Sequence, residues 1–122
     1  MRHKRGNAKL NKPWDQRVAL LRGQVSSLLI HGHVTTTAAR SQEVKRIAER
    51  LITRLRSGEV HDSREAMKIL YTKEVLYSLK NKVLPAVKDR EKGGYLAEYK
   101  VGFRRGDGAL LVRLEVPDFP VE

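Results

Sequence analysis

The first twelve residues of the chain concentrate side chains that bind phosphate. The segment has no acidic residue, its only large apolar side chain after Met1 is Leu10, and its basic residues are Arg2, His3, Lys4, Arg5, Lys9 and Lys12. Guanidinium and ammonium groups form charge-assisted hydrogen bonds with phosphate oxygens. With so little apolar surface to bury, residues 1–12 are predicted to stay extended in water and to order only against RNA or DNA phosphate.

The whole chain has the charge of a polyanion-binding protein. Its 122 residues include 25 Lys and Arg against 14 Asp and Glu, a net charge of +11. This length and 40% hydrophobic residues predict one domain with a modest core. There is no cysteine, which excludes disulfides and thiolate sites. The hydrophilic start and charge-broken apolar stretches fit neither a signal peptide nor a membrane span, so a soluble, intracellular protein is expected.

Catalysis is a weak alternative. The four histidines are His3, His31, His33 and His61, and a small hydrolase using His31 or His33 is one possible reading. Neither histidine neighbours a serine or carboxylate in a known nucleophile arrangement, and no HExxH spacing occurs. We therefore expect no enzymatic activity, no metal, no cofactor and no small-molecule substrate.

Two further sets of basic residues could contact phosphate. Arg104 and Arg105 lie in a predicted tight turn, where they either clamp phosphate or are solvated turn charges. A predicted helix from Ala38 carries Arg40, Lys45, Arg46, Arg50 and Arg54. These residues either form a solvated face paired with Glu43 and Glu49 or leave unpaired charge for nucleic acid, because basic residues outnumber acids on this helix.

Aromatic residues offer possible stacking surfaces. Trp14 could stack on a base, although an aromatic residue beside a first helix is more often a partial core anchor. Tyr95, Tyr99 and Phe103 alternate along a predicted strand, which favours core packing over a stacking platform.

The spacing of apolar residues divides the chain into predicted helices and strands. Apolar residues at helical spacing predict helices over 13–31 and from Ala38 to Gly58, a short helix capped by Asp62, and another helix from Thr72 that ends or kinks at Pro85. Strands are predicted over 33–36, 95–103 and 110–116, the last two joined by a glycine-containing hairpin turn. In the second strand, Tyr95, Ala97, Tyr99, Val101 and Phe103 are predicted to share the core face.

These elements predict an α+β fold. Helices pack on a small, about three-stranded mixed sheet that includes the C-terminal hairpin, giving a two-layer α/β domain. The expected organisation is an extended basic arm over 1–12, one globular domain over 13–116, and a short tail over 117–122 that frays.

Ordered motifs along nearly the whole chain resemble a known family. They are MRH and KLNK at the start, VTTT after the first helix, ERLIT in the second, GGY before the hairpin, and VGFRRGDGA leading into LEV. The chain resembles the bacterial large-subunit ribosomal protein numbered seventeen. Pro13 and Trp14 stand where that family usually has small hydroxylated residues.

The resemblance implies a structural protein that binds large-subunit rRNA and neighbours other ribosomal proteins in the cytoplasm, without membrane contact or obligate homo-oligomerisation. It assigns rRNA contact to Arg2, His3, Lys4, Arg5, Lys9, Leu10, Asn11, Lys12, Arg17, Thr36, Thr37, Arg40, Tyr95, Arg104 and Arg105. A free-standing DNA-binding regulator is the main alternative, but a predicted strand occupies the place of a helix-turn-helix turn.

Overall fold

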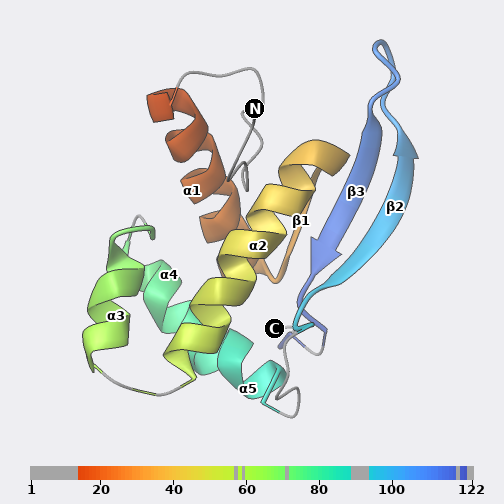
Figure 1. Ribbon diagram of the computed structural model, residues 1–122. Helices are drawn as coiled ribbons and strands as arrows, with labels where there is room; N and C mark the ends of the chain where they lie inside the picture. Colours follow the sequence, from red (N-terminus) through yellow and green to blue (C-terminus); the bar gives the residue numbers. More distant parts are fainter. Residues whose placement is uncertain are drawn as a thin grey trace, which may run out of the picture.

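The computed structural model describes residues 14–56, 58, 60–70, 72–88, 94–117, 119 and 120. In this part of the chain, helices lie on one side of a three-stranded sheet (Figure 1). The elements in chain order are α1 (Trp14–His31), β1 (His33–Thr37), α2 (Ala38–Leu55), α3 (Val60–Met67), α4 (Lys73–Ser78), the π-helical turn η1 (Leu79–Val83), α5 (Leu84–Ala86), β2 (Ala97–Phe103) and β3 (Leu110–Glu115). The predicted two-layer α+β fold is confirmed.

The core lies between the two long helices and the sheet. The apolar stripes of α1 and α2 meet there, and the buried apolar residues of these helices are Leu21, Val25, Leu28, Leu29, Val44, Ala48, Leu51, Ile52 and Leu55. They recur at the helical spacing from which both helices were predicted. Leu114 of β3 and Val116 close the core from the sheet side.

The sheet has the order β1-β3-β2, with β3 in the centre. Both pairings are antiparallel, so the predicted three strands are confirmed, whereas the prediction of a mixed sheet is wrong. The reason is that β1 pairs with β3, the second strand of the hairpin. A pairing with β2, which runs parallel to β1, would have made the sheet mixed. The β2–β3 hairpin extends beyond the helices at one end (Figure 1).

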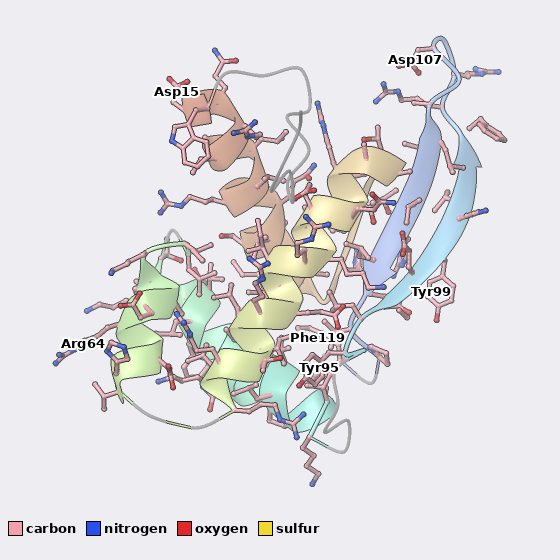
Figure 2. All side chains as sticks on the ribbon, in the orientation of Figure 1. Asp15, Arg64, Tyr95, Tyr99, Asp107 and Phe119 are labelled. Carbon is pink, nitrogen blue, oxygen red and sulfur yellow. The ribbon has the colours of Figure 1, made fainter. Side chains whose placement is uncertain are left out.

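The predicted face of β2 is also wrong. Tyr99 pairs with Arg113, whereas Glu98 pairs with Leu114, a buried core residue. Directly paired residues of an antiparallel sheet point to the same side. Glu98 therefore faces the helices, where its carboxylate lies 3.7 Å from Nζ of Lys45 on α2. Tyr99 points away from the helices (Figure 2).

Helix ends deviate from the predictions by a few residues. α3 begins at Val60, so Asp62 lies in its first turn and is not the predicted cap. Thr72 does cap α4, because its Oγ1 accepts a hydrogen bond from the Val75 amide at 3.4 Å. The helix then widens into η1 before Pro85, which has no amide hydrogen to continue a regular ladder.

One residue of the tail, Phe119, packs against the domain, which the prediction of a fraying tail did not anticipate. Phe119 is partly buried against the core. A Cβ placed on Gly32 would lie 2.5 Å from the Phe119 ring. Gly32, with a φ of +82°, thus turns the chain from α1 into β1 and leaves room for Phe119.

Candidate nucleic-acid interface

The arm predictions fall outside the described residues. They concern Arg2, His3, Lys4, Arg5, Lys9, Leu10, Asn11 and Lys12. The surface described below begins at Trp14, the first residue of α1.

Charge on α2 is compensated unevenly. Arg46 donates to the carboxylate of Glu43 at 3.3 Å, and Nε of Arg54 lies 3.9 Å from Oδ1 of Asp62. Glu49 does not neutralise the basic face of its own helix, because Oε1 of Glu49 accepts the backbone amides of Gly94 and Tyr95 at 3.0 and 3.2 Å.

Two arginines of α2 keep their charge uncompensated. Among the described residues, Arg40 and Arg50 have no carboxylate partner. The alternative, in which carboxylates pair with all the basic residues of this helix, therefore does not hold. The unpaired charge that basic excess predicted is present at these two positions.

A groove of about 250 Å³, the α1–α2 groove, lies between the first two helices and the end of α3. Its lining residues are Trp14, Arg17, Val18, Leu21, Arg22, Glu43, Arg46, Ile47, Arg50, Lys68 and Ile69. Five of these side chains are cationic, and Glu43 is the only carboxylate among them. The floor is apolar, so the groove combines hydrophobic surface with a strongly basic rim.

A second groove of about 730 Å³, the α2–α3 groove, continues along α2 and shares Ile47, Arg50 and Ile69 with the first. Its lining residues are Ile47, Glu49, Arg50, Leu51, Thr53, Arg54, Asp62, Ile69 and Tyr95. Here two arginines face two carboxylates, so the charge balances. The larger hollow is therefore the poorer phosphate site, and the excess positive charge lies at the Trp14 end of α2.

The hairpin turn is basic but partly neutralised. Arg104 donates two hydrogen bonds to the carboxylate of Asp107, one of them from Nε at 3.1 Å. The hydrogen bonds from Arg104 and then from the Ala109 amide lower the pKa of Asp107 to about 2, and the Asp107 carboxylate in turn raises the pKa of Arg104. Arg105 is exposed, and no described residue pairs with its guanidinium. Of the two predicted phosphate ligands, Arg105 is the more available.

Three predicted contact residues lie in or near the interior. Thr36 is 6% exposed, and its Oγ1 accepts a hydrogen bond from Nε2 of Gln24 at 3.0 Å. Tyr95 is 2% exposed, its hydroxyl accepts from Oγ1 of Thr53 at 3.4 Å, and Arg56 lies over its ring. Thr37 is the N-cap residue of α2, although its side chain forms no capping hydrogen bond. The burial of Thr36 and Tyr95 argues against direct RNA contact by these two side chains.

The aromatic residues separate into two kinds. Tyr95 packs in the core, as predicted, and lies with Phe119 near the base of the sheet (Figure 2). Trp14, Tyr99 and Phe103 are 70%, 52% and 76% exposed, so the core role favoured for them is wrong. Sequence alternation did not identify this because it shows which residues share a face but not which face the helices cover.

The alternative functions find little support in the described residues. His31 and His33 are exposed, and no described group of three or more His, Asp or Glu residues could hold a metal. Between α1 and α2 the chain forms β1, a strand of the sheet, where a helix-turn-helix protein has a short turn. None of the described helices is both long and apolar enough to cross a membrane.

Comparisons with known proteins agree on one family. The family model described as ribosomal protein L17 matches residues 20–116. A protein of Clostridium tetani (strain Massachusetts / E88), "Large ribosomal subunit protein bL17", is 43% identical over 111 residues, which cover 91% of this chain and 97% of the relative. Relatives with the same name from Thermoanaerobacter sp. (strain X514) and Clostridium perfringens (strain SM101 / Type A) are 43% and 42% identical over 91% of this chain and 98% and 97% of their own lengths. The chain therefore belongs to the ribosomal protein L17 family.

Proposed function

We propose that this chain is a structural constituent of the large ribosomal subunit and binds large-subunit rRNA through its basic arm and the basic surface of the α/β domain. The family is one of ribosomal structural proteins, and the chain is not an enzyme. The proposed location is the cytoplasmic ribosome, with neighbouring large-subunit proteins as further partners.

The observation that carries the proposal is the charge of the α1–α2 groove. Five cationic side chains line it against one carboxylate, and that carboxylate, Glu43, already accepts from Arg46. Arg17 and Arg50 have no carboxylate partner among the described residues. Such an excess on one face of a small domain is the electrostatic pattern of nucleic-acid binding.

The proposed mechanism has two steps. Positive charge first steers the protein to the rRNA, and residues 1–12 then order in RNA crevices. Phosphate contacts set the position of the protein, while RNA shape supplies the selectivity. Neither step needs a cofactor.

Within the domain, the proposed contacts differ in kind. Arg17, Arg40 and Arg105 are exposed or half-buried and are proposed to contact phosphate directly. Thr36, Thr37 and Tyr95 are proposed to support that surface from beneath, since two of them are buried. Arg104 is proposed to contact RNA less strongly because Asp107 holds it.

Deleting residues 1–12 tests the arm. If its five Lys and Arg residues each neutralise one phosphate, raising the salt from about 50 to about 200 mM weakens rRNA binding about 100-fold. The deletion variant is expected to bind more weakly and with a flatter salt dependence. A matched control shortens the chain at the other end, removing residues 121–122. Unchanged affinity and salt response of the arm deletion would contradict the role of the arm.

Sedimentation separates the ribosomal proposal from the DNA-binding alternative. In a cell lysate at moderate salt, the full chain is expected to comigrate with the large subunit. Persistence in the free protein fraction would instead favour a regulator.

A further inference from the structure

Trp14 is placed unlike an ordinary tryptophan. It is the first residue of α1 and is 70% exposed, although tryptophan side chains gain more from burial than most. The guanidinium of Arg17, one turn along the helix, lies 5.1 Å from the centroid of its ring. This cation–π contact occupies one face of the indole and leaves most of the ring in solvent.

The exposed ring stands at the edge of the α1–α2 groove. Val18 and Leu21 of α1 and Ile47 of α2 form an apolar surface beside it. Pockets for drug-sized ligands are about 300–1,000 Å³, and this groove, at about 250 Å³, is slightly smaller. The space suits one planar ring system and not a longer segment of a folded partner.

The cationic side chains around the groove differ in how firmly other residues hold them. Nε of Arg22 donates to the backbone carbonyl of Ile69 at 2.7 Å, which fixes that guanidinium at the rim. Arg17 and Arg50 pair with no described carboxylate and lie on opposite helices, α1 and α2. An anion on either side of a ring bound in the groove would therefore meet a guanidinium.

We propose that the α1–α2 groove takes one unstacked nucleobase of the rRNA, which packs on the open face of Trp14 while Arg17 and Arg50 bind the flanking phosphates. This inference rests on the proposed rRNA binding and specifies where an RNA base leaves its stack. A flat ring between two phosphates is the ligand that matches an aromatic edge, an apolar floor and a basic rim together. An acidic peptide would satisfy the rim but not the ring.

The chain supplies its own probe, because Trp14 is its single tryptophan. Excited where tyrosine does not absorb, its fluorescence is expected to be quenched when the full chain binds large-subunit rRNA, and access of acrylamide to the ring should fall. This measurement needs no substitution, so it holds even if a variant folds poorly. High salt is expected to dissociate the complex and thereby to restore the full fluorescence.

Substitutions then measure the contribution of the ring. Trp14→Ala is expected to weaken rRNA binding by about 5- to 100-fold, the range found for single base-stacking aromatics, whereas Trp14→Phe keeps most of the affinity. Tyr77→Ala is the matched control, since Tyr77 is 64% exposed on α4 and does not line the groove. It should bind as the parent chain does.

The outcomes separate this inference from the proposed function. Quenching with a loss of affinity in Trp14→Ala supports it. Tight rRNA binding by the parent chain without quenching, or with equal affinity in Trp14→Ala, overturns the nucleobase site and leaves rRNA binding intact. Quenching by polyglutamate but not by rRNA overturns it in favour of an acidic peptide. Failure of the parent chain to bind rRNA at all defeats the proposed function itself.

Discussion

The α1–α2 groove and the β2–β3 hairpin turn are both basic, yet they hold their charge differently. In the groove, five cations face one carboxylate, and Arg17 and Arg50 remain uncompensated among the described residues. In the turn, Asp107 binds Arg104 from three residues away and leaves only Arg105. The positive charge available to a partner thus depends on where the carboxylates fold, and counting basic residues does not reveal it.

The two regions also differ in packing. α1 and α2 bury most of their apolar stripes, whereas β2 exposes Tyr99, Val101 and Phe103 at the edge of the sheet. Figure 2 shows Tyr99 on the face of the hairpin that is turned away from the helices and Asp107 at its tip, beyond them. The helices and the buried side of β3, which includes Leu114, therefore carry most of the stability of the domain, and β2 adds less to it.

The largest expected effect tests this difference in packing. Leu28 of α1 is 0% exposed, so Leu28→Ala should lower the free energy of unfolding by about 2–5 kcal/mol. Val101 of β2 is 57% exposed, and Val101→Ala should change it by no more than about 0.5 kcal/mol. Urea denaturation followed by circular dichroism measures both. Equal losses would mean that the exposed side of β2 contributes to the core.

A smaller effect tests the difference in charge. Replacing Arg17 and Arg50 by alanine should weaken rRNA binding by about tenfold for each arginine and lower the salt slope by about two. Replacing Arg104 and Arg105 should lower the slope by only about one, because Asp107 already occupies Arg104. Filter binding over a salt series measures the slopes. If the salt slope falls by more in the hairpin variant than in the groove variant, the hairpin turn and not the groove holds the more available charge.

The helical layer could be predicted because its information is local. Residues three and four apart in α2 share a face, and that spacing alone identifies the buried stripe from Val44 to Leu55. The turns also depend on local sequence. Gly32 ends α1, and the hairpin reverses between Phe103 and Leu110.

The sheet faces and the free charges could not be predicted in this way because they depend on distant residues. The face of β2 is set by its pairing with β3, which places Glu98 opposite Leu114 on the helix side and within 3.7 Å of Lys45. Glu49 is removed from the charge balance of its own helix by the amides of Gly94 and Tyr95, 45 and 46 residues away. The same holds for the α1–α2 groove, where Lys68 meets α1 only in the folded chain.

The smallest expected effect concerns the turn carboxylate. The hydrogen bonds from Arg104 and then from the Ala109 amide hold the pKa of Asp107 at about 2, below its ordinary 3.8. Because the folded pKa is depressed, the contribution of this group to stability is complete above pH 4 and is lost as the pH falls toward 2. A carboxyl carbon titration by NMR should place the Asp107 midpoint near pH 2. A midpoint near 3.8 would show that the pair with Arg104 does not form in solution.

Neutralising the same carboxylate should make the hairpin turn resemble the groove. Asp107→Asn keeps an oxygen that can accept the Ala109 amide but removes the charge that holds Arg104. At neutral pH this variant should bind rRNA slightly more tightly, with a salt slope steeper by up to about one, because a second guanidinium becomes available to phosphate. Glu65→Gln on α3 is the control, since it frees Lys68 at the edge of the groove by the same change of charge. A steeper slope in the control alone would locate the contact at the groove and leave the turn outside the RNA interface.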